Sequence, residues 1–225
     1  MRDACKALLI DFDGVLRFFS IERLAAVEER HGLRAGALPE IAFHHSLLNP
    51  LVEGEITHAD WELLTAEALH TLAWPTPEDG PDDRLARARA AVADWQSDHG
   101  EIDKVLLEFV REVRAAGVPV ALCTNASDRL DADLAELGLA DEFDVVVNSS
   151  AIRFRKPDKA YFIEASAMVG VPPKLCLFVD DSDRIINGAR VANMAAYRFN
   201  NHADLDYLRV ALGLARAGRA DAADA

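Results

Sequence analysis

The chain of 225 residues is long enough for one large domain, or for a domain that carries a smaller insertion, and 51% of it is apolar. Its 38 acidic and 24 basic residues give a formal net charge of −14, which argues against nucleic acid or an anionic membrane surface as a partner, because both need basic patches. No apolar stretch has the length of a membrane span, and because Met1 to Asp3 lead directly into the first expected strand, we expect no signal peptide.

Three cysteines, Cys5, Cys123 and Cys176, lie far apart in or beside apolar, strand-like runs. Their odd number and their surroundings predict reduced thiols in a core, and therefore a cytoplasmic protein. The sequence leaves the oligomeric state open.

The first expected strand, an apolar run from Leu8, ends in Asp11 and Asp13, which Gly14 follows. Side chains alternate along a strand, so the two carboxylates would point the same way if the strand continued, and Gly14 would allow a sharp turn. At the carboxyl end of a central strand, such a pair needs a cation or a proton between its members. The alternative is a strand end capped by two solvated acids.

From residue 18 to residue 96 the pattern is helical and contains no convincing strand. The second expected helix stops before Pro50, and Thr57 with Asp60 resembles a capping box at the start of the third. Prolines, glycine and acids predict a loop before the fourth helix. We expect helices over 21–31, 35–49, 57–72 and 82–95, with the loop at 74–81, and this arrangement suggests an inserted bundle.

From Glu101 onward helices and strands alternate, which predicts a parallel, doubly wound, Rossmann-like sheet of the α/β class. Gly138 is the expected stop of one helix, and residues 219–225 have too little apolar surface to stay ordered. We expect helices over 101–116, 127–137, 158–169, 183–192 and 203–217, and strands over 118–123, 144–148, 174–179 and 195–199.

Polar residues follow three of the expected strands. Because parallel strands bring their carboxyl ends to one edge, we expect four carboxylates to gather there, and Mg²⁺, which prefers carboxylate and water oxygens, is their natural neutraliser. The polar residues are Asp11 with Asp13, Thr124 with Asn125, and Asp180 with Asp181.

Lys156 would add one positive charge to this edge. Pro157 forces Lys156 into an extended conformation and suits the first position of the next helix, so the ammonium would be aimed at the site.

Four short motifs in this order resemble those of the haloacid dehalogenase-like hydrolases, over nearly the whole chain. They are Asp-Phe-Asp-Gly-Val-Leu at 11–16, Thr-Asn at 124–125, Lys-Pro-Asp at 156–158 and Val-Asp-Asp-Ser at 179–182. The residues around the last two motifs are similar to those of a bacterial subgroup that includes sugar-phosphate phosphatases and the amino-terminal domain of epoxide hydrolases. Residues 17–99 then correspond to the helical cap of that family, and 1–16 with 100–225 to its core.

The resemblance implies a phosphatase that acts on a small phosphorylated metabolite, such as a sugar phosphate, through an aspartyl phosphate. Asp11 would attack phosphorus, while Asp13 would protonate the leaving oxygen and then deprotonate the hydrolytic water. The Thr124 hydroxyl and backbone amides near Asn125 would hold the phosphoryl oxygens, and Lys156 would counter the charge.

The resemblance also implies that Mg²⁺ binds to Asp11, Asp181 and the main-chain carbonyl of Asp13, with Asp180 supporting these ligands from behind. Members of the subgroup usually carry asparagine three residues after the serine of the fourth motif, where this chain has Ile185. The loop that holds Asp181 is therefore expected to be braced differently.

Two asparagines on or after the same helix are relevant to the differences from the subgroup. Asn187 lies about 200° further round the same helix and cannot replace the missing residue. Asn193 stands where glycine is common, and asparagine also tolerates the left-handed conformation.

Other readings stay open at this point. A phosphomutase would keep every core residue named here, and its cap would have to readmit a bound intermediate. A 2-haloacid dehalogenase needs no metal and usually lacks an acid at the position of Asp13. A non-catalytic binding protein would be expected to have lost Asp11, Asp13 or Lys156, and this chain has all three.

In the cap, a few polar or aromatic residues are candidates for contact with the substrate. Histidines on helices are more often surface or satisfied core residues, and the spacing of Trp61 with Leu64 fits a bundle core. The candidates are His44, His45, Asn49, His58 and Trp61.

Overall fold

The computed structural model describes residues 4–72 and 81–214. Within these ranges the main sheet has five strands, all parallel, in the order β5-β4-β1-β6-β7. The strands are β1 (Ala7–Ile10), β4 (Val120–Thr124), β5 (Val145–Asn148), β6 (Cys176–Asp180) and β7 (Ala195–Arg198). The expected doubly wound α/β sheet is confirmed.

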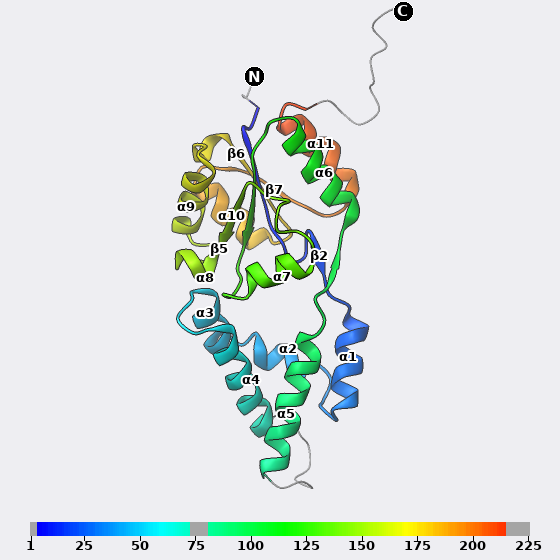
Figure 1. The fold of residues 1–225 in the computed structure, drawn as a ribbon. Helices are drawn as coiled ribbons and strands as arrows, with labels where there is room; N and C mark the ends of the chain where they lie inside the picture. Colours follow the sequence, from blue (N-terminus) through cyan, green and yellow to red (C-terminus); the bar gives the residue numbers. More distant parts are fainter. Residues whose placement is uncertain (1–3, 73–80, 215–225) are drawn as a thin grey trace, which may run out of the picture.

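Helices cover both faces of this sheet (Figure 1). One face packs against α6 (Lys104–Ala115), α7 (Leu130–Glu136) and α11 (Leu205–Ala211). The other face packs against α9 (Lys159–Val169) and α10 (Asp183–Val191). The short α8 (Ser149–Ile152) follows β5, and 3₁₀ turns span Pro173–Leu175 and His202–Asp204.

The apolar run of β1 is buried on both sides of the sheet. Leu8 and Ile10 belong to the core cluster under α6, α7 and α11, whereas Ala7 and Leu9 belong to the cluster under α9 and α10. All four residues have no exposed surface. A strand whose two faces are both covered by helices must be apolar at successive positions, which is why β1 is a continuous run.

The chain order of the strands reverses at β1. From β1 the chain passes to β4 and β5 on one side, and later to β6 and β7 on the other. In register, Ile10 lies between Leu122 of β4 and Val179 of β6. Open α/β sheets bind ligands beyond the carboxyl ends of the strands at such a reversal, so the ends of β1, β4 and β6 mark the place to look for a site.

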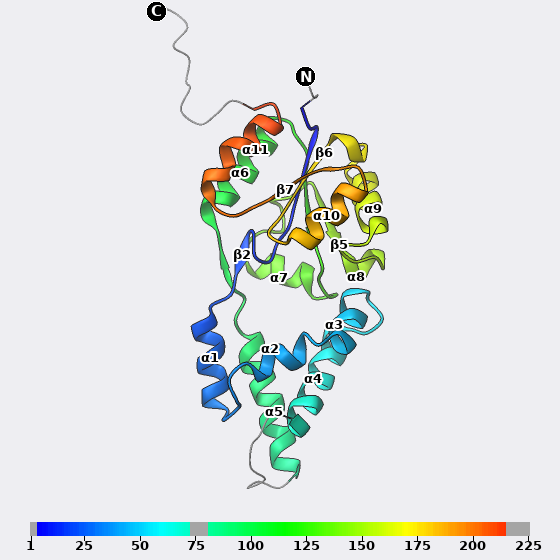
Figure 2. The same ribbon diagram turned by 180° about the vertical axis from the view of Figure 1, so that it is seen from behind.

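A group of helices, called the helical segment here (residues 21–96), lies beyond this carboxyl edge (Figures 1 and 2). It has its own apolar cluster, in which Leu38, Leu69 and Val92 are buried. The antiparallel ribbon of β2 (Arg17–Phe18) and β3 (Glu101–Ile102) connects it to the sheet. Its helices are α1 (Ile21–Arg30), α2 (Ala37–Ala42), α3 (His45–Val52), α4 (His58–Leu72) and α5 (Pro81–Gln96).

The expected helix over 35–49 is wrong, because the chain breaks into α2 and α3 at Phe43 and His44. His44 has an extended backbone, and its ring accepts a hydrogen bond from the amide of Ser46. Pro50 lies inside α3 instead of ending the helix, at a cost of one backbone hydrogen bond in a helix of eight residues. The capping box is confirmed, since Thr57 and Asp60 exchange hydrogen bonds between side chain and backbone.

Three other boundaries differ from the expectation. Glu101 lies in β3, and α6 begins only after Asp103, whose carboxylate accepts from the amide of Leu106. The helix expected from 127 begins at Leu130, and α11 ends at Ala211. Most of the loop expected at 74–81, the end of the last expected helix and the terminal residues 219–225 lie outside the described residues.

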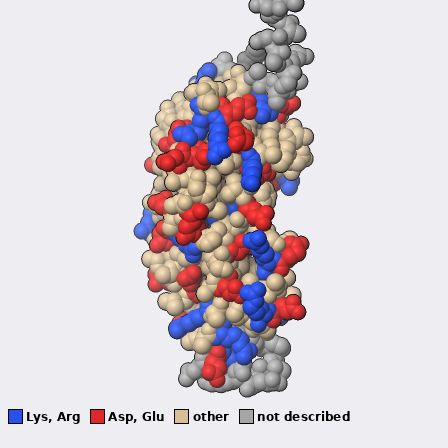
Figure 3. Space-filling view, turned by 45° about the vertical axis from the view of Figure 1, so that its right-hand side comes forward, with Lys and Arg blue, Asp and Glu red and all other residues tan. Residues whose placement is uncertain are grey.

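Cys5, Cys123 and Cys176 are buried thiols, as expected. None of the described helices combines the length and the apolar character that crossing a membrane requires. Figure 3 shows acidic and basic side chains interspersed over one face of the molecule, without a broad basic patch on the described part of that face.

Candidate active site

Three strand ends bring polar side chains together at the reversal point. Asp11 follows β1, Thr124 ends β4 and Asp180 ends β6, and all three residues are buried. The amide of Asp11 donates to the carbonyl of Val179, so the residue is still held against β6 although β1 has ended. The expected convergence of these three positions is therefore confirmed in the geometry.

Lys156 comes from the loop before α9 and reaches into the same place. Its Nζ lies 2.6 Å from Oδ1 of Asp11 and 2.9 Å from Oδ2 of Asp180, and the side chain is only 2% exposed. The expected place of Pro157 is wrong, because Asp158 is the N-cap and α9 begins at Lys159. Pro157 thus precedes the cap, and something else must fix the backbone of Lys156.

Asn125 fixes that backbone. Its Oδ1 accepts from the amide of Lys156 (2.7 Å), and its Nδ2 donates to the carbonyl of the same residue (3.0 Å). The side chain of Asn125 is thereby used to hold one loop against another. Sequence reasoning placed Asn125 near the phosphoryl group and missed this clamp, because a contact across 31 positions leaves no local pattern.

A cluster of carboxylates surrounds the ammonium. Oxygens of Asp11, Asp180 and Asp181 all lie within 4.8 Å of one another. Burial raises the pKa of Asp11 well above its usual value, and Asp180 adds to this rise against the attraction of Lys156. Burial and the charge of Asp180 likewise raise the pKa of Asp181. One ammonium therefore does not balance three carboxylates.

The charge of Lys156 itself is stabilised. Burial alone would lower its pKa, but the attraction of Asp11 and Asp180 outweighs burial, and the pKa of Lys156 is raised. Lys156 therefore stays an ammonium, and the remaining negative charge of the cluster is what an added cation would neutralise.

Gly14 lets two segments of the site approach each other. Its φ of +86° is in the left-handed region, and a Cβ there would lie 2.5 Å from Oδ2 of Asp181. Only glycine combines this conformation with this contact. The turn after Asp13 and the loop of Asp181 therefore form one cradle, whose oxygen donors are of the kind that Mg²⁺ prefers.

The carboxylate of Asp13 does not join the cluster, and the expectation of four gathered carboxylates is wrong here. The strand ends at Ile10 and the chain then turns, so the alternation of side chains no longer governs residue 13. Instead, Asp13 accepts from Nε (2.6 Å) and Nη2 (3.1 Å) of Arg17, and its side chain is 45% exposed.

Arg17 is a site residue that sequence reasoning missed. Its Nη1 lies 3.4 Å from Oδ2 of Asp133 on α7, and its guanidinium lies 4.2 Å from the centre of the Phe12 ring. The spacing of four between Asp13 and Arg17 was the available signal, but outside a helix that spacing does not predict a contact.

The loop after β6 is braced from within. Oδ1 of Asp180 accepts from the amide of Ser182 (2.9 Å). Ile185 is partly buried against the core cluster under α9 and α10, and Asn187 is exposed and accepts from Arg190. Asn187 therefore does not replace the usual asparagine, as expected. Asn193 has a φ of +66°, which confirms the expected left-handed conformation.

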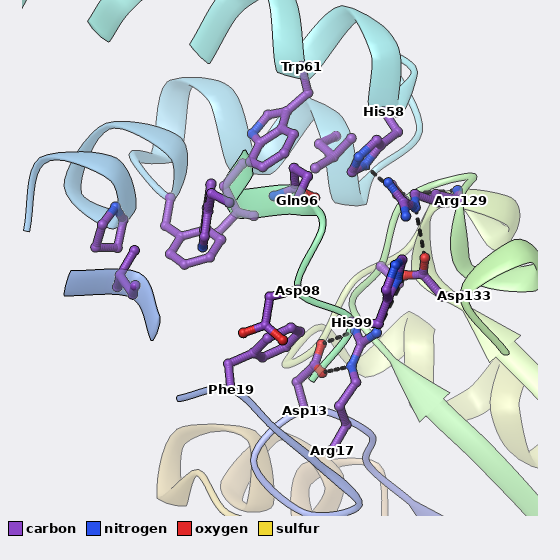
Figure 4. Close-up of a pocket in the computed structure, with 18 of the residues that line it drawn as sticks. Asp13, Arg17, Phe19, His58, Trp61, Gln96, Asp98, His99, Arg129 and Asp133 are labelled. Atoms are coloured by element: carbon purple, nitrogen blue, oxygen red, sulfur yellow. Dashed lines mark hydrogen bonds and ion pairs between the residues drawn. The ribbon is translucent and has the colours of Figure 1, made fainter. Parts of the chain in front are cut away.

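A cavity of about 310 Å³ lies between the carboxyl edge of the sheet and the helical segment. Figure 4 shows Asp13 and Arg17 on one wall and His58 and Trp61 on the opposite wall. His58 Nδ1 lies 3.1 Å from Oγ of Ser127, and Trp61, although mostly buried in the helical segment, also faces the cavity. The other three candidates, His44, His45 and Asn49, are not among the lining residues.

Comparison with known proteins places this geometry in a family context. A family model described as a haloacid dehalogenase-like hydrolase matches residues 5–193. The phosphoglycolate phosphatase of Pseudomonas putida is 26% identical over 219 residues, which cover 89% of this chain and 73% of that protein.

Two further relatives match over shorter stretches. The phosphoglycolate phosphatase of Chromobacterium violaceum is 31% identical over 44% of this chain and 46% of its own length. The fructose-1-phosphate phosphatase YqaB of Escherichia coli is 35% identical over 35% of this chain and 42% of its own length. These two matches span less than half of each relative.

Solved structures share the fold. An enzyme of Bacteroides thetaiotaomicron, solved with magnesium and inorganic phosphate, superposes with a TM-score of 0.66 at 20% identity, over 91% of this chain and 98% of that one. The L-2-haloacid dehalogenase of Xanthobacter autotrophicus superposes with a TM-score of 0.61 at 21% identity, over 88% and 80%.

Proposed function

Because the chain belongs to the haloacid dehalogenase-like hydrolase family, we propose that it is a Mg²⁺-dependent phosphatase for a small phosphorylated metabolite. The observation that carries the proposal is the buried pair of Asp11 and Lys156 inside a cluster of carboxylates. Relatives named as phosphoglycolate and fructose-1-phosphate phosphatases support a phosphoric monoester as substrate. The resemblance of the motifs favours a sugar phosphate within that class.

In the first proposed step, a carboxylate oxygen of Asp11 attacks phosphorus, and the bond between phosphorus and the alcohol oxygen breaks. Asp13 gives its proton to the departing alcohol. In the second step, Asp13 takes a proton from water, the water oxygen attacks phosphorus, and the bond to Asp11 breaks. Inorganic phosphate leaves, and both residues return to their starting state.

Other residues of the site would hold the phosphoryl group. The hydroxyl of Thr124 and backbone amides near Asn125 would donate to its oxygens, and the ammonium of Lys156 would balance the charge that accumulates there. Asn125 would contribute a second effect, because its side chain fixes the backbone of Lys156.

Mg²⁺ would be held by Asp11, Asp181 and the main-chain carbonyl of Asp13, with Asp180 acting from behind these ligands. When bound, it would supply positive charge next to the phosphoryl oxygens. The convergence of three carboxylates around one ammonium supports this assignment.

We further propose that residues 17–99 act as a cap, and that 1–16 with 100–225 form the hydrolase core. The position of the helical segment beyond the carboxyl edge of the sheet supports this division. A cytoplasmic location is also part of the proposal, supported by three cysteines that are buried in the core.

A phosphomutase of the same fold is the second candidate, because it would use the same core residues. Asp13 argues against a dehalogenase, since its carboxylate lines the cavity where a leaving alcohol would need a proton. The likeness to the Xanthobacter dehalogenase concerns the fold alone.

A screen of phosphorylated metabolites with and without Mg²⁺ tests the proposal. We expect phosphate release that stops with a chelator and returns with Mg²⁺. The Asp11→Asn variant should keep its fold, because Lys156 still pairs with Asp180, but lose turnover, because an amide is a poor nucleophile. Release that survives complete chelation, or more than trace activity of Asp11→Asn, would overturn it.

A further inference from the structure

The wall that the helical segment contributes to the cavity beside Asp13 is mainly apolar. Trp95 forms the centre of this wall, with its ring centre 5.6 Å from that of Phe43 and 6.0 Å from that of Trp61. Aliphatic side chains, among them Leu24, Leu51 and Val52, complete it. Burying an apolar group of a ligand against such a wall is favourable, whereas burying hydroxyl groups there contributes little binding free energy.

The arginine side chains that line the cavity are already paired with carboxylates. Each of the three arginines that line it forms an ion pair with an aspartate that lines it too. The pairs are Arg17 with Asp13 (2.6 Å), Arg23 with Asp98 (3.1 Å) and Arg129 with Asp133 (2.8 Å). A second anionic group on the substrate would have to break one of these pairs to find a partner arginine.

The cavity extends from the proposed general acid toward the helical segment. Asp13, the proposed general acid, lies on the sheet side, and Trp61 lies on the helical side (Figure 4). Asn125, which clamps Lys156, follows β4 and also lines the cavity. An ester whose phosphoryl group lies at Asp11 and whose bridging oxygen lies at Asp13 would therefore extend its alcohol portion toward Phe43 and Trp95.

We propose that the substrate is a phosphate monoester of an uncharged alcohol that carries an aromatic ring or a branched apolar group. This inference rests on the proposed phosphatase function, and within the phosphoric monoesters it replaces the sugar phosphate that the motif resemblance favours. The volume of about 310 Å³ is sufficient, since about 150 Å³ holds one benzene ring. A second carboxylate, as in phosphoglycolate, or a polyhydroxylated chain does not match this apolar wall.

The test compares esters whose chemistry at phosphorus is matched. 2-Phenylethyl phosphate, glycerol 3-phosphate and phosphoglycolate are all esters of unactivated alkyl alcohols, so differences in kcat/KM report the alcohol portion. With Mg²⁺ present, we expect 2-phenylethyl phosphate to exceed each of the other two by on the order of 100-fold. Equal or lower kcat/KM for 2-phenylethyl phosphate would overturn the inference.

Two further measurements separate this inference from the proposed function. If 4-nitrophenyl phosphate, whose leaving group is activated, released no phosphate, the phosphatase function would be wrong. Binding of benzylphosphonate, which cannot be hydrolysed at its P–C bond, should still change the fluorescence of Trp61 and Trp95, and methylphosphonate should bind at least about tenfold more weakly. Equal binding of the two phosphonates would overturn the apolar site.

Phe43 offers a variant with a small risk to folding, because its side chain is 53% exposed. Phe43→Ala should lower kcat/KM for 2-phenylethyl phosphate by about tenfold and narrow the gap to glycerol 3-phosphate. Leu63 on α4 is a matched control, since it is 50% exposed and is not among the lining residues, and Leu63→Ala should leave the preference unchanged. An undiminished preference in Phe43→Ala would count against the inference.

Discussion

Nζ of Lys156 lies 2.6 Å from Oδ1 of Asp11, and both side chains are almost completely buried. The pair does not stand alone, because the same Nζ also binds Asp180. One ammonium thus holds two carboxylates that end neighbouring strands, which makes Lys156 both a structural and a chemical centre of the site.

Replacing Lys156 by methionine should therefore affect stability as well as turnover. Leaving buried carboxylates without their partner typically costs about 3–5 kcal/mol, so Lys156→Met should unfold at clearly lower urea concentration and lose phosphatase activity. Lys159→Met, at the exposed start of α9, is the control and should change neither property. A Lys156→Met protein as stable as the parent would show that the pair does not hold the strand ends together.

Asp13→Asn should separate the two steps of the reaction. Loss of the acid should slow the first step most for esters of poor leaving groups and least for an activated aryl phosphate. Loss of the base should slow hydrolysis of the aspartyl phosphate for every substrate, by on the order of 10²–10⁴-fold. An aryl phosphate should then give a burst of phenol, measured by rapid mixing, and a phosphoryl mass on the peptide that contains Asp11. Equal slowing of all esters without burst or adduct would mean that Asp13 is not the general acid.

Gly54, between α3 and α4, lies against the core at Ser150. Its φ is +68°, and a Cβ there would lie 2.3 Å from the carbonyl oxygen of Ser150. Gly36 has a similar φ of +77° with nothing within 4 Å, so the two glycines differ mainly in this contact.

Gly36→Ala should lose about 1 kcal/mol of stability, because alanine is strained in the left-handed region. Gly54→Ala should lose more, because its Cβ would also overlap the carbonyl oxygen of Ser150. Only Gly54→Ala should push the helical segment away from the core and lower kcat/KM. Urea unfolding and steady-state kinetics of both variants measure this. Equal activity of the two variants would mean that the contact with Ser150 has no part in forming the cavity.

Asp144 connects the start of β4 to the region before β5, and it should make stability depend on pH. Hydrogen bonds from Arg114 hold the pKa of Asp144 below its usual value, and the amide of Val120 adds to this effect. Because the pKa is lower in the folded state, Asp144 contributes stability above its unfolded value of about 3.9 and loses that contribution as the pH falls through the folded value.

Asp144→Asn should accordingly cost about 1 kcal/mol or less at pH 7, since the ion pair is partly exposed, and the difference from the parent should shrink as the pH falls below about 4. Urea midpoints over this range provide the measurement. Asp141→Asn is the control, because Arg114 binds Asp141 through the backbone carbonyl, which asparagine retains. A difference between Asp144→Asn and the parent that does not vary with pH would contradict the assignment.

The sheet was predictable because its strands are continuous apolar runs separated by helices with clear periodicity. The positions of Asp11 and Asp180 followed, since parallel strands place their carboxyl ends together. The ribbon of β2 and β3 was not predictable, because two residues per strand produce no periodic pattern.

Two contacts of the site that sequence reasoning missed have one physical origin. The clamp of Asn125 on Lys156 and the pairing of Arg17 with Asp133 join positions that are 31 and 116 residues apart. Local patterns carry no information on such contacts. The side chain of Asp13 was misplaced for a related reason, since the rule of alternation ends where the strand ends.

Arg17 belongs to β2, through which the chain passes from the sheet to the helical segment. Its guanidinium donates two hydrogen bonds to the carboxylate of Asp13. If Asp13 is the general acid, the position of its carboxylate and the position of the helical segment both depend on Arg17. A movement of the helical segment that displaces β2 would also displace Asp13. Arg17 would then couple entry of the substrate into the cavity to the correct placement of the acid.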